Sequence, residues 1–387
     1  MKSIVVSGVI ANKHLSGGAI WTRLNWTLGF RELGFDVYFV EEIEAASCVD
    51  ADGQPAEFRA SANTAVFARV MRQFGLETKS ALLLRGSEEG IGLTRAELAR
   101  VAVDAEALIN ISGHLSDPQL LPRFRRKAFI DLDPGFTQIW EATGLPNMRL
   151  RDHDYHFTIG ENIGKPNCII PDVGCNWRAT RQPNVLRLWK VQRPPAMIGF
   201  TSIGRWRGPY GALDYAGQRF GLKAHEWRKF VELPQRVSQP FEIALDIDQA
   251  DQRDIDALVS HGWNLVDPTV VSRDPDAVQG YLGASGAEFS AAQGVYVGTN
   301  SGWVSDRTVC YLASGRPALV QETGFSENHL AGAGLLPFRT LDEAIAGAEE
   351  IVRNYRDHCT AARELAERDF DSDPVLSELI DQIDVQP

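Results

Sequence analysis

The chain has 387 residues, which is long enough for two domains that each bury a hydrophobic core. Hydrophobic residues make up 44% and charged residues 23% of the sequence, as in an ordinary soluble globular protein. The formal net charge of −12 argues against a nucleic acid or an anionic membrane as the main partner, because both are themselves negative. A local basic pocket would still be enough to bind a small anion.

The cysteines and the N-terminus indicate the cellular compartment in which the protein is expected. Five cysteines are present, with no C-x-x-C pair, so we expect free thiols rather than a disulfide framework or a zinc site. The N-terminal residues 1–9 contain too short an apolar run for a signal peptide, and no apolar stretch is long enough to span a bilayer. We expect a cytoplasmic protein without an integral membrane segment.

The first half of the chain alternates short apolar runs with helical patterns. Ser3–Gly8 predicts a strand, Ala19–Leu33 a helix with one apolar side, and Phe35–Val40 a second strand. This order opens a Rossmann-like domain, but it lacks the G-x-G-x-x-G loop, which argues against a dinucleotide-dependent oxidoreductase. Further strands are predicted at 107–112, 128–131, 157–159 and 168–170, and helices at 65–74 and 94–102.

A proline-flanked segment, Pro183–Pro195, predicts a boundary between domains. We expect a first domain over residues 1–185, a second over 192–371, and a terminal helix in residues 372–387. In the second domain strands are predicted at 196–201, 241–245, 264–266, 287–290 and 317–321, and helices at 226–232, 275–282, 305–314, 340–355 and 360–368.

Residues 296–326 hold the most informative pattern, in which a Gly/Ser/Asn loop precedes a short helix. Ser305 is a helix cap, and Asp306 suits the positive N-terminal end of the helix. Gly315 ends the helix, and Pro317–Gln321 is an apolar strand followed by a second small-residue loop. Open α/β sheets bind ligands at such strand ends.

This segment therefore consists of a loop, a helix that ends in A-S-G-R-P, a strand and a glycine loop. In that order it resembles the donor-binding segment of nucleotide-sugar glycosyltransferases with the GT-B fold. The resemblance implies an α/β protein with two Rossmann-like domains facing across a cleft, and a C-terminal helix that crosses back to the N-terminal domain. It also implies that the first domain binds the acceptor and the second the nucleotide-sugar donor. The donor-binding residues that it implies in this segment are Ser301, Gly302, Ser305, Asp306, Arg307, Thr323, Gly324 and Phe325.

One feature departs from the family pattern. Retaining members carry two glutamates separated by seven residues, and these positions are Gly302 and Cys310 here. Asp306 lies one helical turn before Cys310, so we expect it to take over the ribose contact. Retaining or inverting stereochemistry stays open, as do the donor sugar, the base and the acceptor.

Arginines are the expected partners of the donor diphosphate, because a guanidinium fork can hold two phosphate oxygens. Arg205 and Arg207 lie in the loop after the first strand of the second domain, where retaining relatives place an arginine and a lysine. The alternative is that both are solvated loop residues. Arg307 is a third candidate, which could instead pair with Asp306.

An inverting reaction also needs a base for the acceptor hydroxyl. Many inverting relatives place a histidine in the loop after the first strand, oriented by an aspartate after a later strand. His14 and Asp133 are the matching residues here, with Gly17 and Gly18 in the same acceptor-side loop as His14. His114 follows another strand, at a corner where retaining relatives have a histidine that contacts the donor sugar.

Asp131-Leu132-Asp133 spells the D-x-D of a different, metal-dependent glycosyltransferase fold, and we interpret it as coincidence. No cluster has metal-ligand spacing, so neither a metal nor a cofactor is expected besides the nucleotide sugar.

The leading hypothesis is a metal-independent glycosyltransferase that acts on a small-molecule or glycan acceptor. The alternatives are a sugar-nucleotide epimerase or hydrolase on the same scaffold, and a non-catalytic two-lobed protein that closes on a small ligand.

Overall fold

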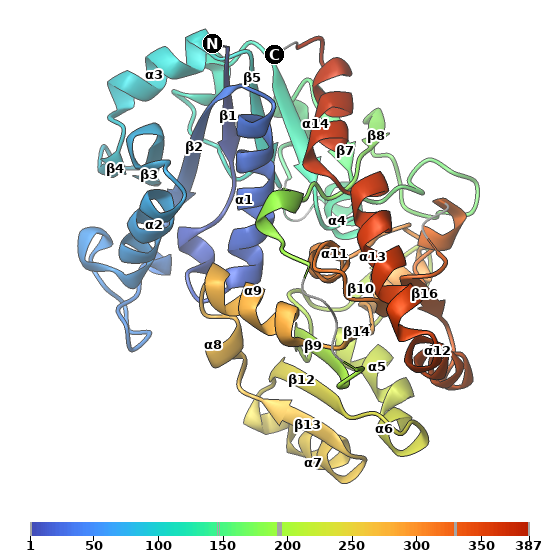
Figure 1. The fold of residues 1–387 in the computed structure, drawn as a ribbon. Helices are drawn as coiled ribbons and strands as arrows, with labels where there is room; N and C mark the ends of the chain where they lie inside the picture. Colours follow the sequence, from blue (N-terminus) through green and yellow to red (C-terminus); the bar gives the residue numbers. More distant parts are fainter. Residues whose placement is uncertain (1, 145, 147, 192–195, 329–330, 386–387) are drawn as a thin grey trace.

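The computed structural model describes residues 2–144, 146, 148–191, 196–328 and 331–385 of the chain. Two separate sheets, each flanked by helices, form the two halves of the molecule (Figure 1). The start of the predicted second domain at residue 192 and the last two residues of the predicted terminal segment lie outside the described residues.

The first sheet has eight strands in the order β4-β3-β2-β1-β5-β6-β7-β8, parallel throughout except for the β3–β4 pair. Strands in its middle are buried on both faces, as all five residues of β5 show, which is typical of a parallel sheet covered by helices. The strands are β1 (Ser3–Ser7), β2 (Asp36–Ile43), β3 (Ser80–Leu84), β4 (Gly90–Gly92), β5 (Ala107–Ile111), β6 (Lys127–Asp131), β7 (Tyr155–Thr158) and β8 (Trp177–Ala179). The helices are α1 (Gly17–Glu32), α2 (Ala62–Gln73), α3 (Arg95–Asp104) and α4 (Phe136–Thr143).

The second sheet has six parallel strands in the order β13-β12-β9-β14-β15-β16. These strands are β9 (Phe200–Arg205), β12 (Phe241–Asp246), β13 (Trp263–Val266), β14 (Ala287–Ser290), β15 (Ala318–Gln321) and β16 (Leu335–Phe338), and a hairpin of β10 (Leu213–Tyr215) and β11 (Gln218–Phe220) stands apart from the sheet. The helices are α5 (Lys223–Trp227), α6 (Leu233–Arg236), α7 (Gln252–Ser260), α8 (Pro268–Val271), α9 (Pro275–Ala284), α10 (Gly294–Gly298), α11 (Asp306–Ala313), α12 (Leu341–Arg353) and α13 (Tyr355–Asp369).

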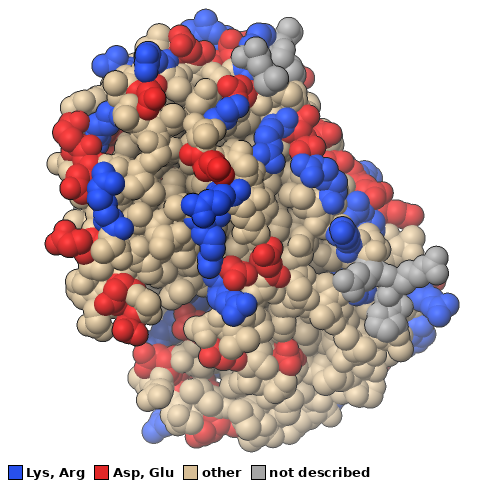
Figure 2. All heavy atoms as spheres, turned by 60° about the vertical axis from the view of Figure 1, so that its left-hand side comes forward, with Lys and Arg blue, Asp and Glu red and all other residues tan. Residues whose placement is uncertain are grey.

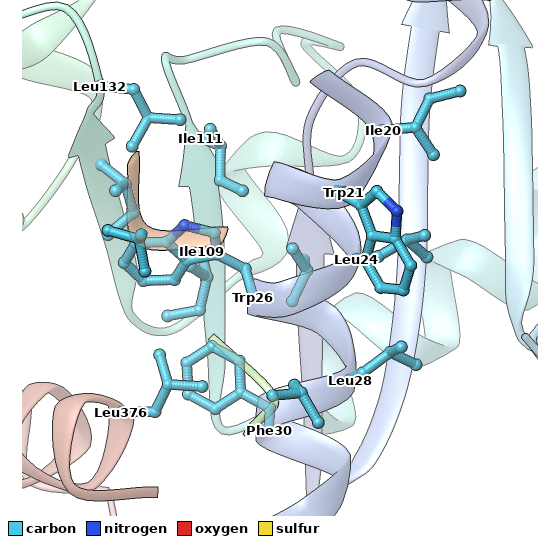
Figure 3. Packing of buried hydrophobic residues seen from close by; sticks show 14 of the residues in the cluster. Ile20, Trp21, Leu24, Trp26, Leu28, Phe30, Ile109, Ile111, Leu132 and Leu376 are labelled. Atoms are coloured by element: carbon cyan, nitrogen blue, oxygen red, sulfur yellow. The ribbon is translucent and has the colours of Figure 1, made fainter. Parts of the chain in front are cut away.

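The last helix, α14 (Ser372–Asp381), leaves the second domain and packs on α1 of the first, as the sequence predicted. Both chain termini therefore lie at the same end of the molecule (Figure 1). Leu376 of α14 is fully buried in the same cluster of side chains as Phe30 of α1 (Figure 3). Helix α1 approaches so closely at Gly29 that a Cβ there would lie 2.5 Å from Leu376 Cδ1.

Two strand predictions need correction. Residues 168–170 form no strand: this apolar run is flanked by Pro166 and Pro171, which lack the N–H of a sheet ladder, and β8 pairs with β7 instead. The strand predicted at 196–201 begins only at Phe200, because Gly199 has a φ of +132° that a strand does not allow.

Some strands were not predicted at all, namely β3, β4, β8, β16 and the β10–β11 hairpin. Runs as short as Ser80–Leu84 do not separate strand from helix by periodicity alone. Among the helices of the described residues, none is long and apolar enough to cross a membrane. All five cysteines are free thiols.

Candidate functional site

A cavity of about 270 Å³ lies between the two domains, at the carboxyl ends of strands from both sheets. The N-terminal domain contributes Thr22 and Arg23 of α1 and Asp133, which follows β6. The C-terminal domain contributes the end of β9, the first residue of α5, the segment after β14 and the start of α11. This is the edge at which the sequence predicted a ligand.

Lys223, the first residue of α5, places its side chain in the cavity wall. Burial and then the nearby Arg307 cation lower the pKa of its ammonium to about 7. No described residue accepts a hydrogen bond from it. A Cβ at Gly204 would lie 3.0 Å from the Lys223 Nζ, so the glycine makes room for the ammonium at the end of β9. A half-buried cation that has no hydrogen-bond partner among the described residues is suited to bind an anion.

The two arginines predicted to bind the diphosphate differ in position. Arg205 lines the cavity, and its half-exposed side chain forms an ion pair with Asp246 at 3.2 Å. Arg207 instead donates two hydrogen bonds of 2.8 Å to Asp251 and is not brought into the site. The loop after β9 turns back toward the start of α7, which explains this difference.

Arg307 lines the cavity, but its guanidinium is already hydrogen-bonded to other groups of the protein. It donates to Glu288 Oε1 at 2.7 Å, to the Ile203 carbonyl at 2.7 Å and to Ser290 Oγ at 2.5 Å. Glu288 is fully buried, so this pair supports the cavity wall from behind. The alternative pairing of Arg307 with Asp306 is not formed.

Asp306 lies at the start of α11 and lines the cavity, as predicted. Ser305 caps the helix by accepting a hydrogen bond from the Arg307 N–H. One Asp306 oxygen accepts the Thr22 hydroxyl across the cleft, and the other lies 3.3 Å from Ser305 Oγ. Asp306, which we expect to contact the ribose, therefore lines the cavity and also joins the two domains.

The remaining loop residues of the predicted donor site contact Asn162 of the N-terminal domain. Its Nδ2 donates to the Gly324 carbonyl at 3.1 Å, and its backbone N–H donates to the Ser301 carbonyl at 3.1 Å. Gly302, with a φ of +78°, lets Asn162 approach: a Cβ there would lie 3.0 Å from the Asn162 Cγ. Since Asn162 fills the space between the two loops, these residues form a domain contact instead of lining the cavity.

Two further residues of these loops serve the fold in the same way. Thr323 Oγ1 donates to the Trp303 carbonyl at 2.6 Å, and Phe325 is almost fully buried. Neither side chain faces the cavity.

Asp133 lies in the cavity and accepts hydrogen bonds from two tyrosines of the other domain. The Tyr210 hydroxyl lies 3.1 Å from Oδ2 and the Tyr296 hydroxyl 3.2 Å from Oδ1. Burial and the Asp131 carboxylate raise the pKa of Asp133 to about 6, against the opposing effect of the Arg23 cation.

The predicted His14–Asp133 pair is therefore not formed. The turn after β1 directs His14 Nδ1 to Asn63 Nδ2, 3.1 Å away, and burial lowers the pKa of His14. His114 also lies outside the cavity lining, and burial together with nearby cations lowers its pKa to about 3. Neither histidine lines the cavity.

The acceptor-side loop touches the C-terminal domain. The Gly17 N–H donates to the Ser272 carbonyl at 2.6 Å, and a Cβ at Gly17 would lie 2.1 Å from the Asp274 carbonyl oxygen. Only glycine fits this approach, whereas Gly18 faces open space.

Arg23 is a site residue that the sequence did not reveal. Its Nη1 donates to the Ala19 carbonyl of the same helix at 3.3 Å, while its buried Nε has no hydrogen-bond partner within the part of the chain that the structure describes. A Cβ at Gly8 would lie 2.8 Å from the Arg23 Cγ, so Gly8 makes room for this side chain. The usable signal is an arginine in the middle of a helix, between the buried residues Thr22 and Leu24.

An aromatic pair forms another part of the cavity wall. The Tyr296 and Trp303 rings stack with centroids 4.2 Å apart and both line the cavity. Nothing in the sequence distinguishes these two rings from the aromatic residues of the core.

The D-x-D sequence has a structural explanation. Asp131 is fully buried and accepts hydrogen bonds from Thr137, Gln138 and Thr158 at 2.6–2.8 Å. Both of its oxygens therefore serve the fold. Within the described residues, no group of three or more potential metal ligands occurs.

Comparisons with known proteins identify the fold but no sequence family. No family model and no curated protein match the chain. In structure it is similar to an α-glucosyltransferase in complex with UDP and a 13-mer DNA containing an HMU base, with 12% identity, a TM-score of 0.60 and 100% of each chain covered. It is similar to HepE of Anabaena in complex with UDP-glucose, with 9% identity, a TM-score of 0.60 and coverage of 99% of this chain and 100% of that one. It is also similar to sucrose-phosphate synthase from Thermosynechococcus elongatus, with 12% identity, a TM-score of 0.55 and 99% of each chain covered.

These full-length similarities show that the chain has the GT-B fold, which confirms the predicted fold class.

Proposed function

We propose that this protein is a glycosyltransferase that moves a sugar from a nucleoside-diphosphate sugar to a hydroxyl or another nucleophile of an acceptor. The observation that carries the proposal is Lys223, which has no hydrogen-bond partner among the described residues and which lines, together with Arg205, a cavity between two GT-B domains. In this proposal residues 192–371 bind the donor and residues 1–185 bind the acceptor.

The donor half of the cavity has what a departing diphosphate requires. Negative charge develops on the leaving group as the sugar is transferred, and fixed cations stabilise that charge. Lys223 and Arg205 supply the cations, and the Arg307–Glu288 pair holds the wall behind them. Asp306 at the start of α11 is the proposed ribose ligand, and the stacked Trp303 offers an aromatic surface.

Ligands of the similar structures support this choice of donor. HepE of Anabaena was solved with UDP-glucose, and the α-glucosyltransferase was solved with UDP. Their identities of 9% and 12% to this chain are too low to transfer a sugar or a base, so we propose only the nucleoside-diphosphate sugar as a class.

The acceptor is proposed to be a small molecule or a glycan. The face in Figure 2 carries acidic and basic side chains interspersed, without a continuous basic surface for a phosphate backbone. Exclusion of nucleic acid stays a prediction, since one protein of the same fold was solved with DNA. Independence from metal ions and from cofactors, and a cytoplasmic location, are likewise proposals.

A ligand screen tests the proposal. UDP, GDP and ADP should be added separately to the protein with EDTA present, and the unfolding temperature measured, because a ligand that binds the native state raises it. We expect one nucleoside diphosphate to stabilise the wild-type protein and to stabilise Lys223→Met much less. No response to any of the three would contradict the proposal, and a response abolished by EDTA would contradict metal independence.

An epimerase on the same scaffold is the second candidate. A putative UDP-N-acetylglucosamine 2-epimerase from Listeria monocytogenes is similar with 13% identity, a TM-score of 0.50 and coverage of 99% of this chain and 96% of that one. Incubation with UDP-N-acetylglucosamine and no acceptor separates the two, because only an epimerase would form the 2-epimer.

A further inference from the structure

We propose that Asp133 removes the proton from the acceptor, as the general base of an inverting transfer. The inference rests on the proposed glycosyl transfer and assigns a catalytic residue to it. Asp133 follows β6 in the N-terminal domain and faces the donor half of the cavity.

Position selects Asp133 from the other candidates. Asp133 and Asp306 are the two carboxylates among the described residues that line the cavity. Asp306 belongs to the donor-side helix, and its carboxylate accepts hydrogen bonds from the hydroxyl groups of Thr22 and Ser305. Asp133 is on the domain proposed to bind the acceptor, so it is the carboxylate that an acceptor hydroxyl meets on its way to the sugar.

The surroundings of Asp133 are those of an oriented base. Tyr210 and Tyr296 each donate one hydrogen bond, so each oxygen is fixed in direction and keeps a further lone pair. Both tyrosines belong to the C-terminal domain, so the carboxylate is held in place when the domains are together.

The charged groups around Asp133 have opposing effects. Asp131 of β6 favours the protonated form, Arg23 of α1 favours the ionised form, and Lys13 of the turn after β1 is a further nearby cation. The two tyrosine hydrogen bonds also favour the ionised form, and the pKa of Asp133 is about 6. At neutral pH the carboxylate is therefore charged and able to accept a proton.

The chemical step balances without a further reactant. The acceptor oxygen forms a bond to the anomeric carbon of the sugar, and the bond from that carbon to the diphosphate oxygen breaks. The acceptor proton passes to Asp133, and the nucleoside diphosphate leaves with the electron pair. Attack opposite the leaving group inverts the anomeric configuration.

Where the screen selects UDP, the test uses UDP-glucose with water as the acceptor, so that no acceptor needs to be known. Where it selects GDP or ADP, the corresponding GDP- or ADP-sugar and nucleoside diphosphate take the place of UDP-glucose and UDP. For wild type and Asp133→Asn we would measure UDP release against pH and UDP affinity by calorimetry. We expect Asp133→Asn to lower the rate by about 10²–10⁴-fold and to remove the loss of rate below pH about 6. UDP affinity should stay nearly unchanged, because Asp133 is not on the donor side.

Tyr210→Phe and Tyr296→Phe distinguish a base from a residue that only joins the domains. Both variants keep the carboxylate but remove a hydrogen bond that favours its charged form. The acidic limb of the rate profile should therefore move to higher pH, with much of the maximal rate kept. If Asp133 were only a domain contact, the tyrosine variants would lose as much rate as Asp133→Asn and show no shifted limb.

Two further results would overturn the assignment. One is a rate for Asp133→Asn close to wild type while UDP binds normally. The other is α-glucose as the first product seen by NMR, since inversion of UDP-glucose gives β-glucose. A wild-type protein that bound no nucleoside diphosphate would instead contradict the proposed function itself.

Discussion

The Thr22 hydroxyl of α1 donates a hydrogen bond to the Asp306 carboxylate of α11, and this bond joins the two domains beside the cavity. The proposed ribose ligand of the donor and a domain contact are thus combined in one side chain. A bound nucleoside would compete with Thr22 for the carboxylate, so the two roles can be separated by mutation.

Asp306→Ala should weaken UDP binding by roughly 1–3 kcal/mol, because a buried carboxylate–hydroxyl bond to the ribose is lost. Calorimetry with UDP and with its 2′,3′-dideoxyribose analogue measures this loss. The analogue should be weakened much less, since it lacks the hydroxyls. Thr22→Val is the control: it removes the domain contact, leaves the carboxylate free and should bind UDP at least as tightly as wild type. Equal losses for both ligands would show that Asp306 serves only the domain contact.

The pKa of Lys223 predicts a pH dependence of donor binding. The free protein holds this ammonium with a pKa of about 7, well below its ordinary value of 10.5. A diphosphate favours the charged form, so binding above pH 7 takes up a proton. Affinity for UDP-glucose should therefore fall as pH rises above 7, by up to about tenfold per pH unit. Titrations in two buffers of different ionisation enthalpy would measure the proton uptake directly.

Lys223→Met tests the same residue by removal. It should weaken UDP-glucose at pH 6.5 by about 1.5–3 kcal/mol and abolish the proton uptake, because the charged donor is gone. UDP-glucose is the appropriate ligand, since its diphosphate bears no group that titrates near neutral pH. Unchanged proton uptake in this variant would assign the titration to another group.

The stability of the free protein should change with pH in the direction opposite to the donor affinity. The unfolded chain binds more protons than the folded one between pH 7 and 10.5, so the Lys223 contribution to the free energy of unfolding rises with pH in that window.

Arg205 and Arg207 form a matched pair of loop arginines that the structure separates. Arg205→Gln should weaken UDP-glucose by about 0.5–1.5 kcal/mol, a modest loss because solvent screens a half-exposed charge. Arg207→Gln should leave the affinity unchanged, since Arg207 is bonded to Asp251 outside the cavity. Calorimetry on both variants checks this, and an equal loss for the two would mean that Arg207 moves into the site with the donor.

Local signals in the sequence predicted much of the fold. The capping residues Thr94 and Asp274 each mark the start of a helix, and Ser305 caps α11 as expected. Such caps act within one helical turn, so a single stretch of sequence contains all the information that they need.

Long-range contacts account for what the sequence did not reveal. Thr22 and Asp306 are 284 residues apart, and Asp133 and Tyr210 are 77 apart, yet both pairs meet at the cavity. The topology of parallel strands indicates that Asp133 faces the cleft, but not which side chain of the opposite domain it meets. Lys223 was missed for the same reason, because only the folded sheet brings the start of α5 to the end of β9.

The crossing helix α14 allows a test of the fold itself, at Gly29. In a solvent-facing helix Gly→Ala ordinarily stabilises by about 0.4–1 kcal/mol. Here a Cβ would lie 2.5 Å from Leu376 Cδ1 and 2.9 Å from Ser372 Cβ, so Gly29→Ala should destabilise by about 1–3 kcal/mol through overpacking. Gly280 of α9 is the control, because a Cβ there meets nothing within 4 Å and Gly280→Ala should stabilise.

Leu376→Ala completes a double-mutant cycle with Gly29→Ala. Alone it should lower the free energy of urea unfolding by about 2–5 kcal/mol, since Leu376 is fully buried. Combined with Gly29→Ala it should cost less than the sum of the two single changes, because the shorter side chain vacates the space that the new methyl group enters. The Ser372 contact remains in the double variant, so the relief should be partial. Strict additivity, or a stabilising Gly29→Ala, would show that α14 does not pack on α1 in solution.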